Sequence, residues 1–120
     1  MRKEPKDPGA FIPLKHATYQ VLLALGDDEL HGYAIMQAVS EMTGGRESIL
    51  PGTLYAALAR MVDGGLVEER DGPDDPSGGP ARRYYRRSRF GRTVARAESE
   101  RLRALLDIAR AQKILSGEGK

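Results

Sequence analysis

The residues best suited to chemistry in this chain are arginines that crowd into one short stretch. Six of them lie between positions 82 and 92 with no acidic residue among them: Arg82, Arg83, Arg86, Arg87, Arg89 and Arg92. Guanidinium groups pair with phosphates, so this run presents a localised basic strip to a polyanion. The net charge of the whole chain is only +2, because acidic residues gather elsewhere, at positions 27–29 and 71–75. The distribution of charge therefore favours nucleic-acid binding more than the net charge does.

Residues that could support catalysis or hold a metal are few and badly spaced. The chain has no cysteine, and its two histidines, His16 and His31, fall on different predicted elements. Neither belongs to a Glu-x-x-His or His-x-x-x-His pattern, and the sequence has no nucleophile motif and no phosphate-cradling glycine loop. We expect no enzyme activity, no metal and no cofactor, and we expect His31 to cap or pack a helix.

The composition predicts one small cytoplasmic domain. Of the 120 residues, 40% are hydrophobic, which is enough for a modest core, and 30% are charged. The absence of cysteine fits a reducing compartment. No apolar run approaches the roughly 20 residues that span a bilayer, and the first residues lack the apolar region of a signal peptide. We therefore expect no membrane partner.

A short helix followed at once by a strand must position the candidate groups. Pro51 marks its start, Leu54, Leu58 and Met61 recur at helical spacing, and Gly64-Gly65 ends it. The outer face would carry mostly small and hydroxyl side chains: Thr53, Tyr55, Ala56, Ala59, Arg60 and Asp63. Such a face suits a helix that enters a groove closely, although an ordinary amphipathic surface helix would have the same pattern.

The elements around this helix predict a mainly α chain with a small β-hairpin. We expect helices at 11–25 and 30–42, strands at 66–70 and 82–88, a flexible loop at 71–80, and a last helix from 89 to about 115. Ser88 is a suitable N-cap for that last helix, which would be about 40 Å long. The predicted divisions are a flexible arm at 1–10, a DNA-binding domain at 11–88, a dimerisation helix at 89–116 and a disordered tail at 117–120.

The last helix carries an apolar seam that a core of about 80 residues cannot cover. The side chains that we expect to meet a second copy are Leu102, Leu105, Leu106, Ile108, Ala109 and Leu115. Leaving several aliphatic groups in water costs about 1.5–3 kcal/mol for each side chain, which favours a homodimer. The alternative is that the helix folds back onto the first helix of its own chain.

Several motifs together resemble the PadR-like transcriptional regulators. They are the sequences at 31–35 (HGYAI), 51–58 (PGTLYAAL), 64–67 (GGLV) and 83–85 (RYY), with Gly91. The resemblance covers roughly residues 14–96. It implies a winged helix-turn-helix, a C-terminal dimerisation helix, and repressor activity at operators. It also implies release by a small-molecule effector lodged between the dimer helices and the winged domain.

The resemblance and the residue types together give a set of expected DNA contacts. Thr53 and Tyr55 would meet DNA, Tyr55 at a phosphate, and Arg82-Arg83 would form the wing. Thr53, Ala56 and Arg60 would read bases, while Arg82, Arg83 and Arg86 would neutralise phosphates. Strand alternation places Arg82 and Arg86 on one face and Arg83 on the other, so only one set can face DNA.

Each of these contacts has a structural alternative. Arg60 would otherwise pair with Asp63 or Glu69, Thr53 would be a first-turn residue, and Tyr55 would pack under the wing. The hairpin tip carries Asp74 and Asp75, which suit a minor groove poorly, so we expect contacts at the base of the wing. For the chain as a whole, we predict a dimeric repressor on double-stranded DNA with an inverted-repeat operator. The alternative is a winged-helix module that binds only proteins.

Overall fold

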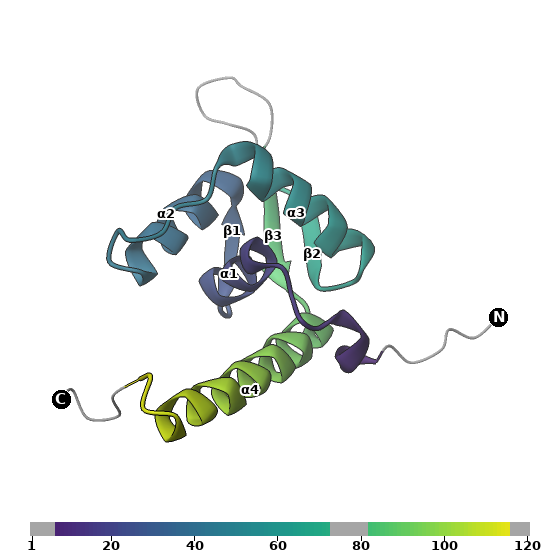
Figure 1. Cartoon of the computed structure of the whole chain (residues 1–120). Helices are drawn as coiled ribbons and strands as arrows, with labels where there is room; N and C mark the ends of the chain where they lie inside the picture. Colours follow the sequence, from purple (N-terminus) through teal and green to yellow (C-terminus); the bar gives the residue numbers. More distant parts are fainter. Residues whose placement is uncertain (1–6, 73–81, 116–120) are drawn as a thin grey trace.

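The computed structural model describes residues 7–72 and 82–115. Three helices pack against a small sheet, and a fourth, longer helix runs beneath them (Figure 1). The helices are a 3-10 helix η1 (Pro8–Phe11), α1 (His16–Leu25), α2 (Gly32–Met42), α3 (Pro51–Asp63) and α4 (Arg89–Ala111). The strands are β1 (Glu29–His31), β2 (Val67–Asp71) and β3 (Arg83–Arg87). This arrangement confirms the predicted mainly α winged-helix fold.

The sheet has one strand more than the sequence predicted. Its order is β1-β3-β2, and both pairings are antiparallel. β2 and β3 form the predicted hairpin, while β1 lies on the other edge of β3 and pairs Leu30 with Tyr85. The prediction of a helix from Leu30 was wrong at its start, because residues 29–31 are extended and α2 begins at Gly32.

The core lies between the helices and the inner face of the sheet. The stripe predicted on α3 is confirmed, since Leu54, Leu58 and Met61 are at most 1% exposed. They meet side chains of α1 and α2, among which Leu22 and Ile35 are fully buried. With one face of α3 anchored this way, its opposite face is left at the surface.

The first helix starts later than the sequence predicted. The expected helix from Phe11 begins at His16, and residues 8–11 instead form η1, which Asp7 caps by accepting the N–H of Gly9 at 3.0 Å. The predicted flexible arm therefore contains ordered residues from Pro8 onward. Its residues 1–6 lie outside the described part of the chain, as do 73–81 of the predicted loop and the tail at 117–120.

α4 is capped as predicted at its start but ends earlier. The Ser88 hydroxyl accepts the N–H of Gly91 at 2.8 Å. The helix ends at Ala111 because Lys113 adopts a left-handed conformation (φ 63°) and Ile114 donates its N–H back to the Ala109 carbonyl. The helix is therefore about 35 Å long, and Leu115 lies beyond it, contrary to the prediction.

The start of α4 is fastened to the turn that follows α3. The Ser88 hydroxyl donates to the carbonyl oxygens of Gly65 and Leu66, at 2.6 and 3.0 Å, and the Ser88 N–H also donates to Leu66. Gly91 lies so close to Leu66 that a Cβ there would be 2.0 Å from the Leu66 carbonyl oxygen. This joint sets the direction in which α4 leaves the domain.

The two halves of α4 have different surroundings. In the first half, Val94 and Ala95 are buried, the Tyr19 hydroxyl of α1 donates to Ser99 at 2.7 Å, and Ser99 donates in turn to the Ala95 carbonyl. Glu98 is only 3% exposed and is held by Arg101 through two hydrogen bonds of 2.9 and 2.8 Å. The same helix face continues past the core as an exposed apolar stripe.

Candidate nucleic-acid interface

The outward face of α3 is an exposed strip of mostly small side chains. The predicted contact residues Thr53, Tyr55, Ala56 and Arg60 are all exposed. The opposite side of α3 carries the buried stripe that anchors the helix in the core, which leaves this face at the surface. The helix can therefore approach another surface closely over its whole length.

Tyr55 lies against the beginning of α2 and not under the hairpin. A Cβ placed on Gly32 would come within 2.1 Å of the Tyr55 hydroxyl, so only glycine fits beneath this ring. Tyr55 nevertheless stays 49% exposed. Tyr55 thus packs on Gly32 at the junction of α2 and α3, although about half of the residue stays accessible to solvent.

A shallow depression at this junction collects residues from three parts of the chain. Its volume is about 240 Å³, and it is lined by His31, Gly32, Tyr33, Tyr55, Arg82 and Arg83. Two guanidinium groups and two phenols thus converge beside the start of α2. Backbone N–H groups at a helix start add a positive end to the same place. The structure brings together Tyr55, Arg82 and Arg83 from the predicted contacts.

His31 joins α2 to the base of the wing. Its Nδ1 accepts the N–H of Ala34 at 3.3 Å, so the predicted capping role is confirmed. Its Nε2 lies 3.0 Å from the Arg82 guanidinium, and its ring meets Tyr84 edge-on. A neutral imidazole accepts a hydrogen bond at only one of its nitrogens, so at any moment His31 accepts either from the Ala34 N–H or from Arg82, but not from both. Burial and the charge of Arg82 lower the pKa of His31.

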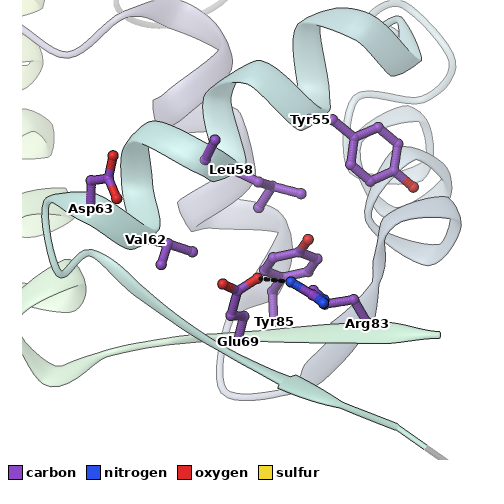
Figure 2. A pocket seen from close by; sticks show the side chains of 8 residues that line it. Tyr55, Leu58, Val62, Asp63, Glu69, Arg83 and Tyr85 are labelled. Atoms are coloured by element: carbon purple, nitrogen blue, oxygen red, sulfur yellow. Dashed lines mark hydrogen bonds and ion pairs between the residues drawn. The ribbon is translucent and has the colours of Figure 1, made fainter. Parts of the chain in front are cut away.

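Arg83 faces a groove between α3 and the hairpin. It forms ion pairs with Glu69 at 3.2 Å and Asp71 at 3.5 Å. Figure 2 shows the first pair lying beside the ring of Tyr85, below α3. The groove has a volume of about 320 Å³ and is lined by Tyr55, Leu58, Ala59, Val62, Asp63, Glu69, Arg83 and Tyr85. Burial raises the pKa of Tyr85, which keeps its phenol protonated.

Arg86 lies on the opposite face of the sheet. Arg86 pairs there with Glu68 at 2.8 Å, and beside it Arg70 forms two bonds of 2.7 Å with Glu29 while its guanidinium lies over Tyr84. The structure therefore does not bring the predicted Arg86 to the surface that holds Tyr55 and Arg83. Alternation along β3 separates Arg83 from Arg86 as the sequence indicated. Arg82, which we expected to share a face with Arg86, instead lines the depression at the start of α2 together with Arg83, because it precedes the first residue of β3.

No acidic residue lies within the arginine strip in the sequence, but in the folded chain acidic side chains from other parts of the chain lie beside it. Arg87 is largely buried, pairs with Asp27 at 3.2 Å and donates to the Leu22 carbonyl at 3.3 Å, so it has a structural role. The strip's partners, Glu68 and Glu69, come from the neighbouring strand. In the register of the hairpin, Glu68 stands opposite Arg86 and Asp71 opposite Arg83, whereas Glu69 stands opposite Tyr85 and reaches Arg83 diagonally.

Arg60 stands apart from the other basic groups. It lines a separate, mostly apolar depression with Lys15, Phe11, Leu14 and neighbouring residues. Within 7–72 and 82–115, no ion pair joins Arg60 to Asp63 or Glu69, and Glu69 is engaged by Arg83. Arg60 is therefore exposed near the far end of α3 from Tyr55.

Other kinds of site find no support in the described residues. No group of three or more His, Cys, Asp or Glu side chains there could hold a metal ion. None of the helices in that part of the chain is both long and apolar enough to cross a membrane.

Solved structures of transcriptional regulators share this fold. A regulator from Clostridium thermocellum superposes with a TM-score of 0.69 at 22% identity, covering 80% of this chain and 88% of that one. A PadR family regulator from Clostridium difficile gives 0.68 at 23% identity, covering 81% and 97%. Bacillus subtilis PadR, solved in complex with operator DNA, gives 0.62 at 22% identity, covering 71% and 47%.

Sequence comparison identifies the family. A curated relative, an uncharacterized 37.1 kDa protein in a Streptomyces fradiae transposon, is 54% identical over 47 residues, or 39% of this chain. The chain spans only 13% of that relative's length. Residues 21–97, which are more than half of the chain and include α3 and the hairpin, match the transcriptional regulator PadR-like family. The chain therefore belongs to the PadR-like family of transcriptional regulators.

Proposed function

We propose that this chain is a sequence-specific repressor that binds DNA as a homodimer. The observation that carries the proposal is the convergence of Tyr55, Arg82 and Arg83 beside an exposed α3. The related Bacillus subtilis PadR was solved with operator DNA, which supports a DNA-binding role for this fold. A DNA-binding regulator of this family would work in the cytoplasm.

Phosphate contacts in this proposal belong to the α2–α3 junction. Tyr55, which is half exposed, would donate its hydroxyl to a phosphate, and Arg82 and Arg83 would pair with phosphates on the same strand. We leave Arg86 out of this set because it lies on the opposite sheet face, paired with Glu68. Several such contacts would make the affinity fall steeply with salt.

Base contacts would come from the outer face of α3. Ala56 and the methyl group of Thr53 suit thymine methyl groups in the major groove, and Arg60 could reach a guanine edge. The small side chains along this face let the helix axis approach the base edges. Thr53→Ala should therefore relax the choice of operator, whereas Arg83→Ala should weaken binding to all sequences alike.

The homodimer would form through the second half of α4. Leu105, Leu106 and Ile108 are each about half exposed, at 50, 47 and 56%. Burying the exposed half of an aliphatic side chain contributes about 1 kcal/mol, and a two-fold axis uses every such residue twice. The first half of α4 already packs on α1 of its own chain. The helix would therefore make both of the contacts that the sequence left as alternatives, one with its own first helix and one with a second copy.

Such a dimer explains the expected form of the operator. Two α3 helices related by a two-fold axis would enter successive major grooves about 34–36 Å apart, which reads an inverted repeat. We also propose that a small-molecule effector releases the repressor from DNA, which is what the family resemblance implies.

The test is selection of bound sequences from random DNA with the purified protein. We expect an enriched inverted repeat whose affinity falls steeply as salt rises. A winged helix that binds only proteins would enrich no sequence. Binding that is indifferent to salt would equally contradict phosphate contacts through Arg82 and Arg83.

A further inference from the structure

Arg83 is not free at the proposed DNA surface. Its guanidinium lies 3.2 Å from a carboxylate oxygen of Glu69, and both side chains keep access to water, with exposed fractions of 56 and 34%. The pair lies on the sheet face toward α3, beside Tyr85 (Figure 2). The second acid near Arg83, Asp71, is farther away at 3.5 Å and is 78% exposed.

The position of Arg83 links this ion pair to the DNA-facing surface. Arg83 lines both depressions that flank Tyr55, the one at the start of α2 and the groove between α3 and the hairpin. Glu69 lines only the second of these two depressions. A phosphate that reached Arg83 from the Tyr55 side would therefore compete with Glu69 for the same guanidinium.

We propose that Glu69 is an intramolecular competitor of the DNA phosphate, holding Arg83 in the free protein and lowering affinity for DNA of any sequence. This inference rests on the proposed DNA binding. The physical reason is that the Glu69 carboxylate already accepts a hydrogen bond from Arg83 at 3.2 Å, and a phosphate would need the same guanidinium as its donor.

The competition acts on the sequence-independent part of binding. Phosphate contacts supply nearly all of the affinity for random DNA. A phosphate contact is made to operator and random DNA alike, so Glu69 lowers both affinities by about the same factor and leaves their ratio unchanged.

The chain offers a matched control for this idea. Glu68 is the preceding residue of β2, and it pairs with Arg86 at 2.8 Å on the sheet face away from α3. Glu68→Gln and Glu69→Gln change the net charge equally and lie one residue apart. Only Glu69→Gln releases an arginine that flanks Tyr55.

The experiment measures binding of a fluorescent random-sequence duplex by anisotropy over a series of salt concentrations. Glu69→Gln should bind about two- to fivefold more tightly than wild type, which is the fold-change that corresponds to an exposed ion pair. Its salt slope should steepen by up to about one, as for one added phosphate contact. Glu68→Gln should change affinity less. In an Arg83→Ala background, Glu69→Gln should have no further effect.

Three outcomes separate this inference from the proposed function. If wild type binds no DNA, the proposed function itself fails. If wild type binds but Glu69→Gln is no tighter than Glu68→Gln, Glu69 is not a competitor. A gain that persists without Arg83 would also overturn the inference, since it would reflect only lost repulsion. Thermal unfolding checks that each variant is folded, and Glu69→Ala is a second removal of the same charge.

Discussion

Replacing Gly91 with alanine should damage the joint between α4 and the winged-helix domain. The new Cβ would lie 2.0 Å from the Leu66 carbonyl oxygen and 3.2 Å from Cγ of Arg87. The carbonyl cannot move aside easily, because it already accepts hydrogen bonds from the N–H and the hydroxyl of Ser88. Relief therefore requires a shift of α4 against the turn that follows α3.

The cost has two parts. Overpacking against backbone typically costs about 1–3 kcal/mol. Weakening the two hydrogen bonds of Ser88 adds about 1 kcal/mol for each. We expect Gly91→Ala to lower the free energy of unfolding by about 2–5 kcal/mol, which is a large part of the stability of a small domain.

The assay is urea unfolding followed by circular dichroism at one fixed protein concentration, because stability depends on concentration in a dimer. Gly52→Ala in α3 is the matched control, since a Cβ added at Gly52 would meet nothing within 4 Å. This control should be neutral or more stable by up to about 1 kcal/mol. A Gly91→Ala variant within about 0.5 kcal/mol of wild type, a typical limit for neutral surface changes, would refute the reasoning.

Three further predictions concern titration and assembly. Burial and the charge of Arg82 lower the pKa of His31 below 6.5 in the folded protein. As pH falls below 6.5 the unfolded chain therefore takes up the proton first, and the free energy of unfolding should decrease. His31→Asn can still cap α2 but does not titrate, so it should flatten this part of a plot of stability against pH. The hydrogen bonds from Arg101 hold the pKa of Glu98 below 4.5, so the contribution of this pair to stability is present above pH 4.5 and is lost as pH falls further. Glu98→Gln should lower the free energy of unfolding in urea by about 1–3 kcal/mol at pH 7. The variant should also lack the loss of stability that wild type shows below pH 4.5. Leu105→Glu should give a monomer in sedimentation velocity, whereas Ala104→Glu, off the apolar stripe, should leave the dimer intact; equal masses for the two variants would exclude this helix as the interface.

Local signals in the sequence predicted α3 and the start of α4 well. Pro51 and Gly64-Gly65 bracket α3, and the Ser88 cap acts through short-range geometry that a sequence carries directly. The end of α4 was missed because Lys113 takes the left-handed conformation that glycine usually supplies. Lysine is not a residue type that indicates the end of a helix, so this position carries no signal in the sequence.

Tertiary contacts explain the other differences. β1 is three residues long and exists because β3 has a free edge beside it, so no alternating pattern marks it. The sequence predicted Gly32 only as part of the start of a helix. Its contact with Tyr55 could not be predicted, because it depends on how α2 and α3 cross in the folded chain.

The candidate site was predicted in part. Exposure of the outer face of α3 follows from helical periodicity, and the separation of Arg83 from Arg86 follows from strand alternation. The pairing of these arginines with Glu69 and Glu68 depends on hairpin register, which the long connection between the strands did not fix.

The most direct test of the account is a map of backbone amide shifts in the NMR spectrum as a selected duplex is added. We expect the largest changes at Gly32, at 53–56 of α3, and at Arg82 and Arg83. Changes concentrated on the opposite sheet face, around Glu29, Arg70 and Arg86, would contradict the claim that α3 and the base of the wing hold the DNA.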